Sequence, residues 1–285
     1  MSTGRPAASA CLSSMDPAQL SIAEIKQLLE STPHGKLKPM LAALAGDERA
    51  GVARLVKSVE YRLDWERREA ARLRRLMKYE SDLAERGFNL IAGADEVGRG
   101  ALAGPLVAAA VILRSDARII GINDSKKLTP AQREGLVDEI KAAAVAWAVR
   151  ETSQEEIDTL GLQPANMAAL ARAVGGLEPG PDFIICDGFK LKCGSLPSMA
   201  LIKGDSLSQT VAAASILAKV YRDNLMRGHH DAHPAYGFNI NKGYATAGHI
   251  EAIKKTGPCV LHRRSFYPVS EIYKDQLTFD ETYLS

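Results

Sequence analysis

The sequence predicts an α/β fold preceded by a separate helical module, and three observations support this class. From residue 88 onward, short strand-like apolar runs alternate with helix-like segments. One of these runs, residues 183–186, has no polar alternation, as expected of a strand buried on both faces. Before residue 83 the hydrophobic pattern keeps a helical period instead, which sets the first part of the chain apart.

The composition is that of a soluble globular protein. The 285 residues suffice for one large domain or two, and 46% of them are hydrophobic. A net charge of +2 is too small to indicate a nucleic-acid partner without local clustering. The longest apolar run, residues 101–113, is too short to span a bilayer, so no membrane association is expected. The four cysteines lack metal-type spacing. We therefore expect a reduced, cytoplasmic protein without a signal or transit peptide.

Residues 16–82 are expected to form the helical module, after a disordered tail at residues 1–15. Ser21 and Glu24 have the spacing of a capping box. From Val52 to Met77, apolar residues recur at intervals of three and four, with one polar interruption at Glu66. Nine basic residues surround this stripe: Arg54, Lys57, Arg62, Arg67, Arg68, Arg72, Arg74, Arg75 and Lys78. They form either the solvated face of a docked helix or a basic arm that follows a phosphate backbone.

The elements of the α/β part follow in order. Strands are expected at residues 89–94 and 106–113, close enough to form a hairpin. After a polar loop at residues 123–127, Thr129 and Pro130 begin a helix. A third strand is expected at residues 144–150, a short helix capped by Ser153, and a further helix at residues 163–174.

Acidic residues lie where three of the predicted strands end. Asp95 and Glu96 follow the strand at residues 89–94, and Asp187 follows the strand at residues 183–186. A strand at residues 199–203 is followed by Asp205, after which Ser206 is expected to begin a long helix. Side chains alternate along a strand, so Asp95 and Glu96 are expected to share a site only if the strand ends there. One such acid would be ordinary, but three strand-end sites favour a metal centre, because ligands of α/β sheets gather at strand ends.

Other residues allow more than one interpretation. Gly98 and Gly100 let a ligand approach the backbone, and Arg99 offers a planar fork suited to phosphate. His229 and His233 have the spacing of helical metal ligands, but a polar helix end is the preferred interpretation, because no third ligand is evident. Cys186 is expected to be a packed core thiol.

A series of motifs runs through the second part of the chain in a fixed order. They are DEVGRG at residues 95–100, LAGP at 102–105, DSKKL at 124–128, CDG at 186–188, KGDS at 203–206, AASILAK at 213–219, NKGY at 241–244 and HRRSF at 262–266. With these motifs the chain resembles the bacterial ribonuclease HII family over residues 88–268. Ala101 departs from the proline that is usual in this family.

The resemblance implies a ribonuclease H-like fold over residues 83–270, with a mixed five-stranded sheet flanked by helices, and a C-terminal tail at 271–285. It implies an endonuclease that cuts the RNA strand of RNA–DNA hybrids and nicks 5′ of ribonucleotides embedded in duplex DNA. It makes four carboxylates both catalytic and metal-binding: Asp95, Glu96, Asp187 and Asp205. Oxygen ligands suit Mg²⁺ or Mn²⁺, with two ions during catalysis.

The resemblance and the residue types also give a substrate-binding set: Gly98, Arg99, Gly100, Ser125, Lys126, Tyr244, Arg263 and Arg264. Tyr244 is expected to stack on the nucleotide at the RNA-to-DNA junction, and Arg263 and Arg264 to contact phosphate. Residues 276–279 (QLTF) resemble a truncated sliding-clamp-binding peptide, and a monomer is expected. Two alternatives stay open at this point, a non-catalytic protein that binds hybrid junctions and another metal-dependent phosphoryl-transfer enzyme.

Overall fold

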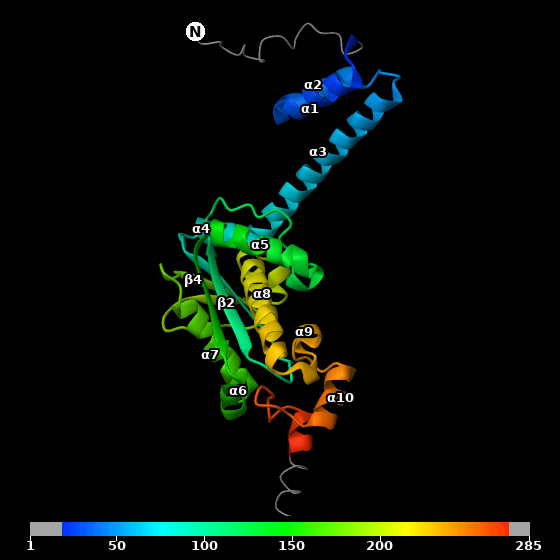
Figure 1. The fold of residues 1–285 in the computed structure, drawn as a ribbon. Coiled ribbons are helices and arrows are strands. Elements are labelled where there is room, and N and C mark those ends of the chain that lie inside the picture. The colour runs from blue at the N-terminus through cyan, green and yellow to red at the C-terminus, as the bar shows by residue number, and fades with distance from the viewer. Residues whose placement is uncertain (1–18, 274–285) are drawn as a thin grey trace, which may run out of the picture. The chain divides into compact units, whose positions relative to one another are not determined.

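The computed structural model describes residues 19–273, which form two compact units that divide between Ala71 and Arg72 (Figure 1). The tail expected at residues 1–15 lies outside the described residues, as does all but residues 271–273 of the expected C-terminal tail. Within the described part of the chain, no helix has both the length and the apolar character needed to cross a membrane.

The first unit contains α1 (Ile22–Ser31), α2 (His34–Leu44) and the N-terminal part of α3 (Ala50–Leu76). The predicted capping box is present at the start of α1, where the side chains of Ser21 and Glu24 bind each other's backbone N–H groups. The unit has its own apolar core: Ile25, Leu29, Leu37, Leu41, Leu44, Val52 and Val56.

The polar interruption in the α3 stripe has a partner inside the first unit. Glu66 Oε2 lies 3.1 Å from His34 Nε2 of α2. Glu66 therefore occupies an otherwise apolar position in the α3 pattern because His34 of the neighbouring helix supplies a hydrogen-bond donor for it. The contact is exposed, so it contributes little to the stability of the unit.

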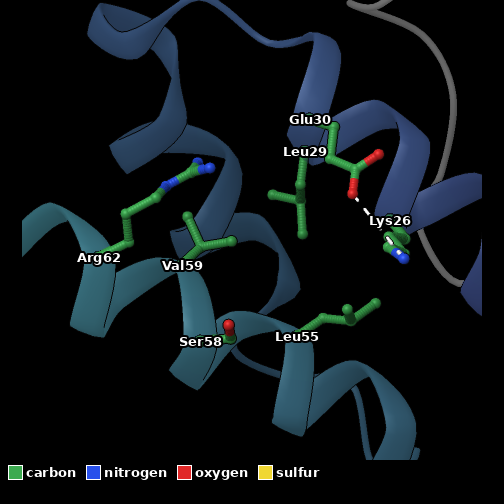
Figure 2. Close-up of a pocket in the computed structure, with 7 residues that line it drawn as sticks. All are labelled: Lys26, Leu29, Glu30, Leu55, Ser58, Val59 and Arg62. Atoms are coloured by element: carbon green, nitrogen blue, oxygen red, sulfur yellow. Dashed lines mark ion pairs between the residues drawn. The ribbon is translucent and has the colours of Figure 1, made fainter. Parts of the chain in front are cut away.

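A cavity of about 160 Å³ lies between α1 and α3 in the first unit (Figure 2). Leu29, Leu55 and Val59 form its apolar wall, and Lys26 pairs with Glu30 at 3.9 Å beside it. Ligand pockets in proteins usually enclose about 300–1,000 Å³. This cavity is smaller than that range, and we assign no ligand to it.

The second unit is built on one mixed sheet of five strands in the order β3-β2-β1-β4-β5. β1 pairs antiparallel with β2 and parallel with β4. β2 and β3 are antiparallel, and β4 and β5 are parallel. The strands are β1 (Ile91–Val97), β2 (Leu106–Leu113), β3 (Ala144–Thr152), β4 (Phe183–Asp187) and β5 (Ser198–Leu201). The mixed five-stranded sheet and its β1–β2 hairpin are thus confirmed.

Helices cover both faces of this sheet (Figure 1). On one face, α5 (Pro130–Ala143) and α8 (Gln209–Ala232) form a core with β2. On the other face, α7 (Leu162–Gly175) packs on β1 and β2, preceded by α6 (Gln154–Leu160). The caps predicted at Thr129 and Ser153 are both present. Alanine is frequent in both cores, which lets the helices approach the strands closely.

α8 makes the closest approach where it crosses β1. A Cβ added to Gly93 would lie 2.2 Å from the carbonyl carbon of Thr210, so only glycine fits there. The helix begins at Gln209 with Ser208 as its N-cap, and the prediction that Ser206 begins it was wrong. Gly204–Ser206 form a separate 3-10 turn, η3. Helix α8 ends as predicted in a polar segment, where the His233 N–H binds the His229 carbonyl.

α4 (Lys78–Glu85) belongs to the second unit and supplies a buried carboxylate to the start of α8. Glu80 Oε1 accepts hydrogen bonds from Ser208 Oγ (2.6 Å), Thr210 Oγ1 (2.8 Å) and Thr210 N (3.0 Å). A negative charge at a helix N-terminus is favoured by the helix dipole. The domain boundary predicted between residues 82 and 83 stays a prediction, but Glu80 has to be retained in any truncation that tests it.

The chain after α8 folds into a small cluster of its own. The 3-10 turn η4 (Pro234–Tyr236), α9 (Phe238–Asn241) and α10 (Ala247–Thr256) enclose it. Its buried residues are Leu102, Ala103, Met226, Tyr236, Phe238, Ile253, Leu261 and Val269. Two of them, Leu102 and Ala103, come from the connection between β1 and β2. The cluster therefore packs that connection against the segment that follows α8.

Candidate active site

Asp95 and Glu96 lie inside β1 and not beyond its end, contrary to the sequence prediction. Asp95 is paired with Ala109 and Glu96 with Ala108, so the strand continues through both. Their side chains accordingly lie on opposite faces of the sheet. Asp95 lies near Ser215 of α8, and Glu96 lies near Asn166 of α7. The two carboxylates therefore flank the strand and do not share one side of it.

Asp187 lies at the end of the neighbouring strand β4, near enough to both carboxylates for its charge to raise the pKa of each. Its Oδ1 accepts a hydrogen bond of 2.6 Å from the N–H of Gly204. A Cβ on Gly204 would lie 3.3 Å from the same oxygen, so the glycine lets η3 approach closely. This contact carries Asp205, the next residue, to the same edge of the sheet. The edge therefore holds all four acids that the sequence singled out.

The ionisation of these acids reflects their crowding. Burial, followed by the charge of Glu96, raises the pKa of Asp95 well above its ordinary value. Burial also raises the pKa of Glu96, although the charge of Arg99 opposes this. Burial raises the pKa of Asp205 to about 6, with further contributions from Asp124 and Asp187. Carboxyl groups that raise one another's pKa in this way need a cation before all of them ionise.

Asp124 is a fifth acid at this edge, and its role was missed in the sequence analysis. It caps the 3-10 turn η2 (Ser125–Lys127) by accepting from the Lys126 N–H at 2.9 Å. Burial opposes its ionisation, but the Lys126 N–H and a hydrogen bond with Asp205 lower its pKa. Asp124 is therefore the more acidic of the two carboxyl groups. The only sequence signal was the position of Asp124 inside the DSKKL motif.

The donor set fits a hard divalent cation. Carboxylate oxygens are the ligands that Mg²⁺ and Mn²⁺ prefer. Glu96 Oε2 is buried without a hydrogen-bond partner, so one ligand oxygen is already desolvated and available. Among residues 19–273, no three His, Cys, Asp or Glu side chains are yet gathered closely enough to enclose a metal. A bound ion would have to draw the mutually repelling carboxylates together.

Arg99 sits beside this acidic edge. Its Nη1 lies 3.5 Å from Glu96 Oε1, and its Nη2 donates to Gln163 Oε1 at 3.0 Å. The guanidinium also lies over the Phe189 ring, 4.8 Å from the centroid. Arg99 is therefore held near a carboxylate while about a third of its side chain is exposed, 36%. A phosphate can reach it from solvent.

A buried arginine packs against the start of the Gly98–Gly100 turn. Arg222 of α8 is fully buried and donates to the carbonyls of Pro105 (2.8 Å), Lys242 (2.9 Å) and Ala103 (3.0 Å). Gly98 has a φ of +92°, and a Cβ there would lie 2.3 Å from Arg222 Nε. The first glycine of the motif is thus required both by its backbone conformation and by this contact.

Arg263 is a second buried arginine that contacts this loop. It is fully buried and donates to the carbonyls of Gly104 (2.9 and 3.1 Å) and Arg99 (2.8 Å). Its guanidinium is therefore occupied by the loop, and the direct phosphate contact predicted for it is not available in this arrangement. Arg263 instead holds the backbone of Arg99 in place through its hydrogen bond to the Arg99 carbonyl. Arg264 stays exposed, stacked over Tyr273 at 4.5 Å.

Tyr244 is brought to the Gly98–Gly100 turn by backbone pairing. Ala101 forms an isolated bridge with Tyr244, and the Leu102 N–H binds the Gly243 carbonyl at 2.8 Å. The Tyr244 ring lies 5.3 Å from the Arg222 guanidinium and 5.7 Å from Lys219 Nζ. The residue is half-buried, so part of it remains accessible to solvent. The two predicted substrate-binding elements are therefore adjacent in the fold.

Ser125 and Lys126, also in the predicted substrate-binding set, lie in η2. Ser125 is buried, with its Oγ 3.0 Å from Ser215 Oγ of α8. Lys126 is exposed in the middle of this turn, whose start is capped by Asp124. Ser125 thus connects η2 to the helix beside Asp95, while the ammonium of Lys126 is free to meet solvent or a phosphate.

A pair of buried histidines supports the Tyr244 loop, and sequence reasoning missed it. His249 Nδ1 lies 2.9 Å from the Tyr244 carbonyl, and His249 Nε2 lies 3.1 Å from His262 Nε2. The Cys259 N–H donates to His262 Nδ1 at 2.9 Å. These contacts assign the protons if both rings are neutral: His262 donates through Nε2, and His249 donates through Nδ1 to Tyr244. Burial accordingly lowers the pKa of both rings, that of His262 to about 4.

The sheet order, the two helical layers and the acidic edge define an α/β nuclease fold of the ribonuclease H type. The family profile "Ribonuclease HII" matches residues 92–269, and the profile "Ribonuclease HII N-terminal domain" matches residues 21–84. The chain therefore belongs to the ribonuclease HII family.

Curated relatives agree with this assignment along nearly the whole chain. The ribonuclease HII of Pelotomaculum thermopropionicum is 46% identical over 252 residues, which cover 88% of this chain and 94% of the relative. That of Listeria monocytogenes is 42% identical over 260 residues, which cover 91% and 98%. The protein is thus a ribonuclease H of type HII, an endonuclease that hydrolyses nucleic acid.

Solved structures share the fold of the second unit. Ribonuclease H2 from Pyrococcus horikoshii superposes with a TM-score of 0.57 at 27% identity, covering 65% of this chain and 97% of that one. Bst-RNase HIII in complex with Mn²⁺ gives a TM-score of 0.52 at 23% identity, covering 65% and 70%. The second likeness concerns the fold alone.

Proposed function

We propose that this enzyme is a metal-dependent endonuclease that cuts the RNA strand of RNA–DNA hybrids and nicks duplex DNA 5′ of embedded ribonucleotides. One observation carries the proposal: the carboxylate edge, the Gly98–Gly100 turn and Tyr244 adjoin one another. A carboxylate cluster alone would serve many phosphoryl-transfer reactions. The Gly98–Gly100 turn beside the Tyr244 ring adds a means of recognising the sugar by direct contact.

Asp95, Glu96, Asp187 and Asp205 would hold two divalent ions, Mg²⁺ or Mn²⁺. Bound ions of this kind activate water and stabilise the leaving oxygen in an in-line displacement. Water attacks the phosphorus 5′ of the ribonucleotide, and the bond to the 3′ oxygen of the preceding nucleotide breaks. The products are a 3′-hydroxyl and a 5′-phosphate. Asp205, whose pKa is raised to about 6, would be favoured in its ionised form when a cation is bound.

The 2′-hydroxyl is the only chemical difference between the target and its deoxyribonucleotide neighbours, so the protein has to contact it. Backbone groups of Gly100, which is exposed and has no side chain, can approach it, and Gly98, buried against Arg222, shapes the turn. Arg99 would exchange its contact with Glu96 for a phosphate, which also frees a carboxylate for metal. Tyr244 would stack at the RNA-to-DNA junction, while Lys126 and Arg264 contact the backbone.

The relatives give partial support for the finer points. Bst-RNase HIII was crystallised with Mn²⁺, and an archaeal ribonuclease HII from Archaeoglobus fulgidus was solved in a complex with PCNA. A corresponding contact of this chain with a sliding clamp would use residues 276–279, which lie outside the described residues. We propose that the enzyme otherwise acts as a monomer.

The test is a nicking assay with three labelled duplexes of one sequence: one with a single ribonucleotide, one with an RNA strand, and one of DNA only. Cleavage of the first two in Mg²⁺ or Mn²⁺, its loss in EDTA and its absence from all-DNA duplex are expected. Binding without cleavage in any metal would favour a non-catalytic junction protein. Cleavage of the all-DNA duplex, or hydrolysis of small phosphate esters, would favour another phosphoryl-transfer enzyme.

A further inference from the structure

One face of α3 within the first unit combines exposed aromatic and basic side chains. Tyr61 is 70% exposed and Trp65 is 45% exposed, although large apolar side chains are usually covered. Arg54, Lys57 and Arg68 are exposed as well. At 100° per residue, these five positions fall within an arc of about 80°. They are therefore a single face, which we call the α3 face.

The α3 face lies away from the core of the first unit. The buried residues of the same helix, Val52 and Val56, point into the core with α1 and α2. Glu66 is turned towards His34 of α2. The aromatic pair is thus not part of the packing that holds the three helices together, and its exposure has no structural purpose within this unit.

Charge on the α3 face is basic. Asp64 is the acid nearest to it and is shared by Arg67, at 2.5 Å, and by Arg68. Both arginine side chains are largely exposed, 76% and 69%, so the pairs are screened and weak. A phosphate can replace Asp64 as a partner of Arg68. The cores of protein interfaces, by contrast, are depleted in charged residues, lysine among them.

We propose that the α3 face binds the duplex DNA that carries the substrate, so that the first unit acts as a second DNA-binding surface. From Arg54 to Arg68 the helix rises about 21 Å, a length over which a duplex carries about 12 phosphate charges. Tyr61 and Trp65 contact the sugar–phosphate edge between the cations at either end. This rests on the proposed function, since it assigns the same substrate. Two linked contacts on one duplex strengthen each other through effective concentration.

The test uses the full-length protein and a labelled all-DNA duplex of 40 base pairs in EDTA, so that neither metal nor cleavage is involved. The face variant Arg54→Gln/Lys57→Gln/Arg68→Gln is compared with Lys26→Gln/Lys36→Gln/Lys38→Gln, which removes the same charge from exposed positions on α1 and α2. Fluorescence anisotropy gives Kd at several salt concentrations. The face variant is expected to lower the slope of log Kd against log salt by about three. The matched control is expected to retain most of the slope.

Trp65 provides an independent readout, because Trp147 is the only other tryptophan of the chain. In a Trp147→Phe background, duplex binding is expected to quench Trp65 emission and to shield it from acrylamide. Tyr61→Ala/Trp65→Ala should weaken binding about tenfold, without a change in the salt slope. Unchanged Trp65 emission while anisotropy reports a bound duplex would overturn the proposal.

Two further outcomes would also overturn it: equal losses in the face variant and its control, or tighter binding of a single strand than of the duplex. Nicking of a duplex of about one helical turn with one ribonucleotide is measured in the same proteins. If the unmodified protein nicks this short duplex and the face variants bind the 40-base-pair duplex normally, the role proposed for the α3 face is wrong and the proposed function stands. If nothing is nicked while the face variants lose binding, the proposed function fails instead.

Discussion

The Arg222 guanidinium lies 5.3 Å from the centre of the Tyr244 ring, and Arg222 is fully buried beneath it. The same guanidinium binds the carbonyls of Ala103 and Pro105 on one loop and of Lys242 on another. One side chain thus joins the loop that follows the Gly98–Gly100 turn to the loop that carries Tyr244, the two elements proposed to contact the substrate. The substrate-binding set therefore depends on α8 for its geometry.

Tyr244 is expected to act through its ring. Tyr244→Phe should keep most of kcat/KM on a duplex with one ribonucleotide. Tyr244→Ala should lose a contribution of about 1–3 kcal/mol, typical of one stacked base. Steady-state kinetics of both variants measures the difference. Equal losses in the two variants would assign the role to the hydroxyl, and no loss in Tyr244→Ala would remove the residue from the site.

Gly98 and Gly100 are expected to differ in what an added methyl group does. Gly98→Ala requires a φ of +92° and places Cβ 2.3 Å from Arg222 Nε, so it should lower the free energy of unfolding by about 1–3 kcal/mol and reduce nicking. Gly100 has no atom within 4 Å of such a Cβ. Gly100→Ala is the matched control and should unfold at nearly the same urea concentration as the native chain. Equal stability of both variants would contradict the described contact.

Comparison of sequence and structure shows which features a local pattern can predict. The strand and helix positions followed from hydrophobic period and from caps such as Thr129, because these signals are local. The placement of Asp95 and Glu96 on opposite faces of β1 did not, since it depends on where pairing with β2 stops. Asp124 was missed because its importance arises from Asp205, which is distant in sequence.

The roles of buried polar residues could likewise not be predicted from the sequence. Arg263 looked like a phosphate contact, but it is fully buried and binds the carbonyls of Gly104 and Arg99. Nothing local distinguishes such an arginine from its exposed neighbour Arg264. The pairing of His249 with His262 across 13 residues likewise requires the tertiary fold. Sequence motifs predict the residues of the site, and packing decides which of those residues are available to a ligand.

Asp187→Asn is expected to abolish nicking and leave the fold intact. The amide oxygen can still accept from the Gly204 N–H, whereas the charge that holds a cation is lost. We expect a loss of more than about 100-fold. Asp182→Asn is the control: Asp182 precedes the same strand and binds the N–H groups of Asn89 (2.7 Å) and Leu90 (3.0 Å). Similar activity in both variants would remove Asp187 from the catalytic set.

The buried histidine pair should make stability depend on pH. The pKa of His262 falls from 6.5 to about 4 on folding, so the unfolded chain takes up a proton more readily. Its contribution, about 3 kcal/mol, is complete above pH 6.5 and is lost as the pH falls towards 4. Urea unfolding between pH 7.5 and 4.5 should show a smaller decline in His262→Gln than in the native chain. The exposed His34→Gln should decline like the native chain, and a parallel decline in all three would refute the prediction.

The position of the nick tests the central claim most directly. A duplex with one ribonucleotide, labelled in turn at each end of the cut strand, is digested in Mg²⁺ and resolved to single nucleotides. The account predicts one cut, at the phosphate 5′ of the ribonucleotide, with a 3′-hydroxyl on one product and a 5′-phosphate on the other. A cut on the 3′ side, a 2′,3′-cyclic phosphate end, or cuts spread over the deoxyribonucleotides would contradict it.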